Sequence, residues 1–156
     1  MTILGIDPGI GRMGWGVIEV KSSKLKVQSY GCVETSSKNT TSERLLIIYK
    51  KVQEIIKQYS PEAMAIEQLF FNTNVKTAFV VGEARGVIIL AGANKKLPVF
   101  SYTPLQVKVA LTGYGKAEKR QVGQMVKVIL KLKEIPKPDD TADALAIALT
   151  HAFSKK

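Results

Sequence analysis

Residues 2–20 read TILGIDPGIGRMGWGVIEV and contain the pattern that decides the fold. The apolar run over 2–7 predicts a buried strand, and 15–20 predicts a second strand. Between them lies PGIGRMG, which is typical of a turn. Its glycines spell GxGxxG, but that dinucleotide-binding pattern should open a helix, and strand-forming residues follow it here. We therefore expect a β-hairpin and no nucleotide cofactor.

The remaining chain predicts strands and then an alternation of helices and strands. Thr40 and Glu43 fit a capping box before a helix over 41–59, and Thr103-Pro104 is a helix start. The other expected strands cover 25–34, 62–67 and 98–102, and the other helices cover 74–93, 117–132 and 139–153. This order predicts an α/β fold with a five-stranded mixed sheet, helices on both faces, and one domain over 1–156.

Composition and charge narrow the class of protein. The chain is 46% hydrophobic and carries 23 Lys and Arg against 13 Asp and Glu. Between Lys95 and Lys137, ten basic residues face only Glu118 and Glu134. Such a one-sided field attracts nucleic acid, although a lysine-rich surface that only maintains solubility is an equal alternative on composition alone. No apolar run could cross a membrane, no signal peptide is evident and one cysteine excludes an internal disulfide, so we expect a cytoplasmic protein.

Four acidic residues stand at the ends of predicted elements: Asp7, Glu67, Asp140 and Asp143. If the strands over 2–7 and 62–67 are parallel neighbours, their terminal acids meet on the rim where α/β sheets bind ligands. The other two are three residues apart, hence on one face of the last helix. In a structural alternative, Asp139 caps this helix and the other two complement its dipole. That alternative is favoured for any single acid and is weaker for four.

Clustered carboxylates repel one another unless cations compensate them. Ligation by oxygen alone suits Mg²⁺ or Mn²⁺ better than zinc. Two such ions, about 3.5–4 Å apart, can clamp the attacking and leaving oxygens of a phosphodiester displacement. This chemistry requires acids and metal but no nucleophilic side chain.

Four blocks of the chain, in the expected order, resemble the RuvC family of Holliday junction resolvases. They are ILGIDPGIGRMGWGVI (3–18), IEQLFFNTNVKTAFVVGEARGV (66–87), SYTPLQVKVALTGYGKAEKRQV (101–122) and DDTADALAIALTHA (139–152). The resemblance implies an RNase H-like fold and symmetric cutting of four-way DNA junctions in recombination and repair. It also implies that Asp7, Glu67, Asp140 and Asp143 are catalytic acids binding two Mg²⁺ ions, although some relatives have His at the Asp140 position.

The same resemblance points to DNA-binding residues. Lys108 and Lys119 match basic residues that the family uses near the scissile phosphate, and Lys116 and Arg120 belong to the same basic block. Phe70 follows Glu67 closely and could stack on an unpaired base, although consecutive aromatics are often core residues instead.

The partners expected from the resemblance are four-way junction DNA, a second copy of the chain and a branch-migration motor in a bacterial cytoplasm. Ala78, Gly82 and Gly86 are spaced by four along the helix over 74–93. Small residues allow close approach, which serves either a twofold dimer contact or packing onto the protein's own sheet. A dimer with two active sites fits the approximate twofold symmetry of a junction.

Three rival functions stay open at this point. An ATPase of the actin and sugar-kinase type shares the Gly-Ile-Asp strand end, but it needs a second lobe for which 156 residues leave no room. A non-enzymatic junction binder would not need four intact acids. Another RNase H-like nuclease, acting on RNA–DNA hybrids or replication intermediates, is the nearest alternative.

Overall fold

A computed structural model describes residues 1–68 and 74–154. Its strands are β1 (Thr2–Asp7), β2 (Arg12–Lys21), β3 (Lys24–Glu34), β4 (Ala63–Glu67) and β5 (Val99–Tyr102). Its helices are α1 (Thr41–Tyr59), α2 (Val75–Asn94), α3 (Pro104–Thr112), α4 (Lys119–Ile129) and α5 (Asp139–Ser154).

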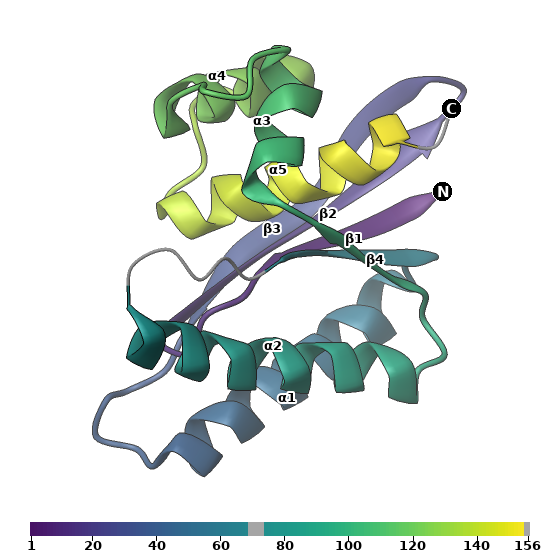
Figure 1. Ribbon diagram of the computed structural model, residues 1–156. Coiled ribbons are helices and arrows are strands. Elements are labelled where there is room, and N and C mark those ends of the chain that lie inside the picture. Colours follow the sequence, from purple (N-terminus) through teal and green to yellow (C-terminus); the bar gives the residue numbers. More distant parts are fainter. Residues whose placement is uncertain (69–73, 155–156) are drawn as a thin grey trace.

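The strands form one sheet in the order β3-β2-β1-β4-β5. β1 is antiparallel to β2 and parallel to β4, and β4 is parallel to β5. Helices α1 and α2 cover one face, while α3, α4 and α5 cover the other (Figure 1). The predicted α/β fold, with a five-stranded mixed sheet between two helical layers, is confirmed.

Local signals place most element boundaries. The predicted capping boxes of α1 and α3 are both formed, at Thr40 with Glu43 and at Thr103 with Gln106. The GxGxxG segment leads into strand β2, as predicted. That strand begins at Arg12, earlier than expected, because its first residues pair with the end of β3. Helix α4 is shorter than predicted, because Gln121 caps the N–H of Glu118 and Lys131 has a left-handed φ of 53°.

Two hydrophobic cores lie on opposite faces of the sheet. Along β1 the side chains alternate, so that Leu4 and Ile6 face α1 and α2, whereas Ile3 packs with Leu145 and Ile147 of α5. All five are fully buried or nearly so. This period of two is the ordinary alternation of a strand, and it determines which face each following residue occupies.

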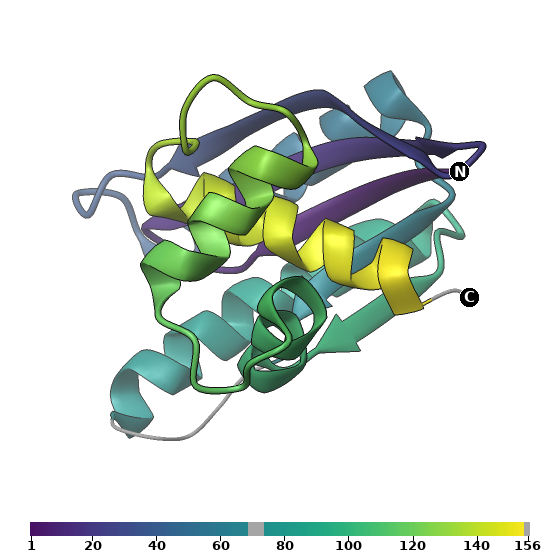
Figure 2. The same cartoon turned by 90° about the horizontal axis from the view of Figure 1, so that it is seen from above.

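Helix α5 crosses the sheet at very close range (Figure 2). A Cβ atom added to Gly5 of β1 would collide with the carbonyl oxygen of Ala144, and one added to Gly14 of β2 would collide with that of Asp140. The absence of side chains at these two positions therefore lets the backbone of α5 rest directly on β1 and β2.

Among the residues that the structure describes, no helix combines the length and apolar character that a membrane span requires.

We predict that Gly14→Ala destabilises the fold by about 1–3 kcal/mol, because the added methyl group forces α5 away from β2. Thermal or chemical unfolding measures the loss. Gly11→Ala is the matched control, since its Cβ would meet only the end of the Arg44 side chain at 3.5 Å. Equal stability of the two variants would contradict the tight contact.

Candidate active site

The two strand-borne acids lie side by side on the α5 face of the sheet. Ile6 pairs with Ile66 across the parallel β1–β4 ladder, so Asp7 and Glu67 are the next residues on adjacent strands. Ile6 and Ile66 are buried against α1 and α2, and the alternation of a strand directs the following side chains to the opposite face. β1 and β4 are thus the parallel neighbours that the sequence analysis required for these two acids to meet.

The other two acids come from the first turns of α5. Asp140 and Asp143 lie on one side of this helix, and the close contact at Gly14 fixes the backbone of Asp140 against β2. A cleft of about 450 Å³ brings all four acids together. Its lining consists of Asp7, Glu67, Pro104, Val107, Lys108, Lys119, Val122, Asp140, Asp143, Ala146 and Ile147.

Burial and mutual repulsion change how these acids ionise. Burial, followed by the negative charges of Glu67, Asp143 and Asp140, raises the pKa of Asp7 to about 8. Burial and Asp143 also raise the pKa of Glu67, while Lys119 opposes this rise. Burial raises the pKa of Asp143 despite its hydrogen bond with Lys119. Burial and mutual repulsion thus oppose the ionisation of these acids, and a cation that enters the cleft would favour it.

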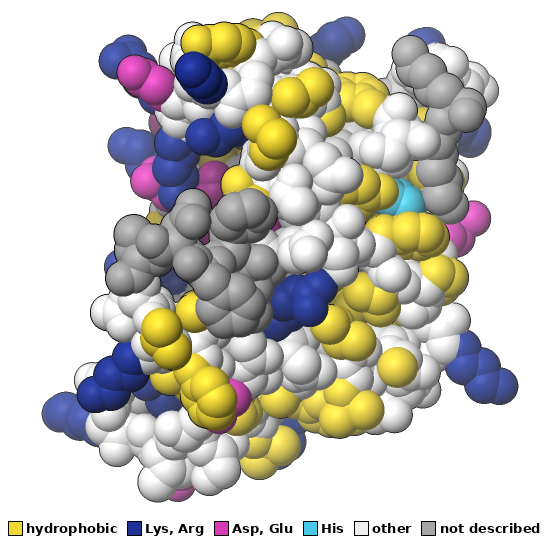
Figure 3. All heavy atoms as spheres, viewed as in Figure 1, with side chains coloured by type: hydrophobic (Ala, Val, Ile, Leu, Met, Phe, Trp, Pro, Cys, Tyr) yellow, Lys and Arg dark blue, Asp and Glu magenta, His cyan; other side chains and the backbone are white. Residues whose placement is uncertain are grey.

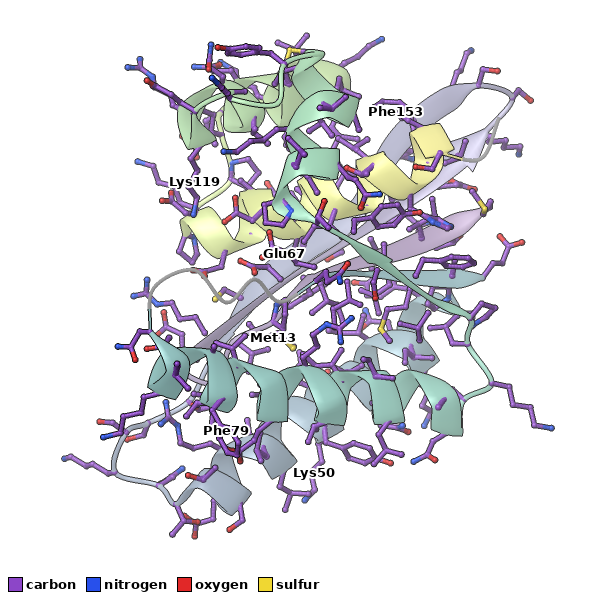
Figure 4. The ribbon with its side chains drawn as sticks, viewed as in Figure 1. Met13, Lys50, Glu67, Phe79, Lys119 and Phe153 are labelled. Carbon is purple, nitrogen blue, oxygen red and sulfur yellow. The ribbon has the colours of Figure 1, made fainter. Side chains whose placement is uncertain are left out.

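Lys119, the first residue of α4, is in direct contact with this cluster. Its Nζ atom lies 2.7 Å from Oδ2 of Asp143 and 3.9 Å from Oδ2 of Asp139. Partial burial lowers the pKa of Lys119, but the hydrogen bond and attraction to Asp143 outweigh that effect and raise it. In Figure 4, Lys119 lies beside the first turn of α5 and Glu67 lies below the same helix. The ammonium group is therefore firmly protonated and held by a candidate metal ligand.

The other predicted DNA-binding residues are distributed around this cleft. Lys108 lines it, and Arg120 lines an adjoining hollow that also includes Lys119 and Lys137. Lys116 is exposed in the segment between α3 and α4, away from the cleft lining. Phe70 lies outside the described residues. Figure 3 shows basic and acidic side chains gathered together at the left edge of the molecule, at the level of α5.

The candidate dimer residues lie on α2, whose buried face is formed by Ala84, Ile88, Ala91 and Gly92. Gly86 is exposed, and a Cβ added there would meet nothing within 4 Å. Ala78 and Gly82 are half-buried. At Gly86 the alternative of tight packing onto the protein's own sheet therefore finds no support.

Arg85, in the middle of α2, contacts the ends of two strands. Its Nε donates to the carbonyl oxygen of Glu67 at 3.0 Å, and its Nη2 donates to Oγ of Ser101 at 2.6 Å. Arg85 therefore ties α2 to the ends of β4 and β5 beside the acidic cluster. Arg85 belongs to the second block that resembles the RuvC family, but a basic residue in the middle of a helix is common and does not by itself predict this contact.

The donor set fits a hard divalent cation. Four carboxylates supply only oxygen ligands, and they outnumber the two lysines that line the same cleft. Within residues 1–68 and 74–154, no group of three or more Asp, Glu, His or Cys side chains is already arranged to hold a metal ion. Lys119 engages one carboxylate that such a site would use, at Oδ2 of Asp143.

Comparison with known proteins agrees with this geometry. The family model "Crossover junction endodeoxyribonuclease RuvC" matches residues 3–151. The protein of that name from Alkaliphilus metalliredigens is 55% identical over 154 residues, covering 99% of this chain and 94% of its own. The one from Finegoldia magna is 53% identical over 156 residues, with coverages of 100% and 95%.

Solved structures extend the match to three dimensions. The structure of Thermus thermophilus RuvC has a TM-score of 0.91 at 44% identity, covering 98% of this chain and 94% of that one. T. thermophilus RuvC in complex with Holliday junction substrate has a TM-score of 0.90 at 42% identity, with the same coverages. The RNase H-like fold expected from the sequence is confirmed. A match of this length and identity shows that the chain belongs to the RuvC family of crossover junction endodeoxyribonucleases.

Proposed function

We propose that this protein resolves Holliday junctions in homologous recombination and DNA repair, as a Mg²⁺-dependent endonuclease. One observation carries the proposal: acids from β1, β4 and α5 line a single cleft together with Lys108 and Lys119. The T. thermophilus relative in complex with Holliday junction substrate supports the choice of DNA. The relatives of this chain come from bacteria, which supports a role in a bacterial cytoplasm.

Asp7, Glu67, Asp140 and Asp143 are the residues that would hold two Mg²⁺ ions, with Mn²⁺ as an alternative. When bound, the ions supply the Lewis acidity that phosphodiester hydrolysis needs. Asp7 and Glu67 extend from neighbouring strands of the sheet, and Asp140 and Asp143 extend from α5 into the same cleft. Lys108 and Lys119 bind phosphate oxygens and neutralise the DNA strand as it enters an acidic cleft. Val107 and Ile147 also line the cleft and give it an apolar part that limits water.

DNA contacts beyond the cleft extend from the basic residues around it. Arg120 and Lys116 bind the backbone of a junction arm, and such contacts make affinity fall steeply with salt. From the resemblance, we also propose that Phe70 stacks on an unpaired base of the junction.

Two copies of the chain form a homodimer through α2. Three exposed apolar side chains on this helix share a stripe with Gly82 and Gly86, since Val75, Phe79 and Leu90 follow the helical spacing of three or four residues. An exposed apolar stripe of this kind is typical of a protein interface. Two active sites related by a twofold axis then nick the junction symmetrically. A branch-migration motor remains a partner proposed from the resemblance.

We predict that Asp7→Asn lowers junction cleavage by at least about a hundredfold, because it removes a metal ligand while keeping the shape of the side chain. Cleavage of a synthetic four-way junction in Mg²⁺ and binding of the same junction in chelator measure the two effects. Binding should stay within about threefold, because without metal the carboxyl of Asp7, with a pKa of about 8, is already neutral at pH 7. Glu54→Gln, on α1, is the matched control. A variant that cuts normally would remove Asp7 from the chemistry.

We predict that Mg²⁺ binding releases a proton from Asp7. The carboxyl of Asp7 has a pKa of about 8 without metal, so at pH 7 it carries a proton that Mg²⁺ must displace. Apparent Mg²⁺ affinity should therefore weaken as the pH falls from about 9 to 6. Calorimetry at pH 7, in buffers with different ionisation enthalpies, should show close to one proton released from Asp7. Binding without proton release, or unchanged by Asp7→Asn, would contradict this assignment.

The dimer is tested by Phe79→Asp, whose charge would be buried in the interface and should convert the dimer to monomers. Sedimentation or light scattering measures the mass. Val128→Asp on α4 is the matched control, because the exposed fraction is 65% for Val128 and 71% for Phe79. A dimer that survives Phe79→Asp and is lost with Val128→Asp would place the interface elsewhere.

A further inference from the structure

Two lysines line the acidic cleft, and they differ in their contacts. Lys119 contacts Asp143 at 2.7 Å and approaches Asp139 at 3.9 Å. Lys108 lines the same cleft but forms no ion pair with any residue of 1–68 or 74–154. Lys119 is therefore bound to the acids, whereas Lys108 is available to bind a ligand that enters the cleft.

Lys119 occupies a position for which a divalent cation would compete. Oδ2 of Asp143 receives the ammonium group, so the lysine and a metal would compete for the negative charge of the same carboxylate. The remaining positive charge would also repel a metal ion placed among the four acids. A metal ion in the cluster therefore weakens the contact of Lys119 with Asp143 and favours its release.

The lysine is free to move. Its side chain is 60% exposed, whereas that of Asp143 is only 27% exposed. Helix α4 does not depend on this side chain, because its start is capped by Gln121 bonding to the N–H of Glu118 at 2.7 Å. A cation at a helix N-terminus is also unfavourable with respect to the helix dipole. Lys119 can leave the acids without unfolding its own helix.

We propose that Lys119 is a resident counter-ion that occupies the acidic cluster before metal binds, and that loading of the divalent metal releases its ammonium group to a DNA phosphate. This inference rests on the proposed function of the cleft. It adds that metal and DNA reinforce each other through one side chain: a phosphate that draws Lys119 away opens Asp143 to metal, and metal that displaces Lys119 makes it available to phosphate. By linkage the two effects have the same size.

The test measures binding of Mg²⁺ alone to DNA-free protein by calorimetry. The titrations are done at pH 9, because loss of Lys119 removes a charge that lowers the pKa of Asp7 and Glu67 and so strengthens proton competition at lower pH. Lys119→Gln should bind Mg²⁺ about fivefold more tightly than the wild type, as expected for loss of one competing ion pair. Lys119→Arg keeps the charge and should stay within about twofold of the wild type. Lys108→Gln is the matched control and should also stay within about twofold.

Cleavage adds a second readout with the opposite sign. Lys119→Gln should cut junctions more slowly despite its tighter metal binding, because it lacks the group that engages phosphate. Unchanged or weaker Mg²⁺ binding in Lys119→Gln, with wild-type binding still dependent on Asp7 and Asp143, would overturn the counter-ion role alone. Equal tightening in Lys108→Gln would also overturn it, by reducing the effect to general charge. Absence of Mg²⁺ binding in the wild type would instead overturn the proposed function.

Discussion

Repulsion among four carboxylates, held where β1, β4 and α5 meet, is the constraint on which the rest of the site depends. The folded chain keeps these groups close although burial and proximity raise the pKa of Asp7, Glu67 and Asp143. Only a surrounding structure that over-determines their positions can do this. The sheet ladder holds one pair, and the backbone contact of α5 with Gly5 and Gly14 holds the other.

That arrangement explains why an acidic cleft belongs to a strongly basic protein. The acids attract metal but repel DNA, so the chain needs positive charge around the cleft, at Lys108, Lys119 and Arg120. The two charge requirements meet at Lys119, which faces the acids from the start of α4. The acidic centre thus serves metal binding, and the basic surface around it serves DNA binding.

Much of this architecture was predictable from the sequence, because its signals are local. Hydrophobic runs, capping boxes and the glycine turn identify the strands and helices, and strand alternation suffices to place Asp7 and Glu67 on one face once β1 and β4 are parallel neighbours. The resemblance supplied the grouping of these acids with Asp140 and Asp143. The contacts of Arg85 with Glu67 and Ser101, and of Lys119 with Asp143, were not predictable, because they join residues distant in sequence whose types occur on any surface. Interpretation of the small residues on α2 needed coordinates as well, since only these show that Gly86 faces outward.

The origin of the acids on two different kinds of element has a mechanical consequence. Asp7 and Glu67 extend from neighbouring strands of a hydrogen-bonded ladder, so their separation is as stiff as the sheet itself. Asp140 and Asp143 belong to a helix whose backbone rests on β1 and β2 at Gly5 and Gly14, and whose residues from Ala144 to Thr150 are all buried. Strand hydrogen bonds therefore set the spacing of one pair of acids, whereas packing against glycine sets the height of the other pair above the sheet. A change that thickens the layer between α5 and the sheet would widen the cleft while the spacing of Asp7 and Glu67 stays the same.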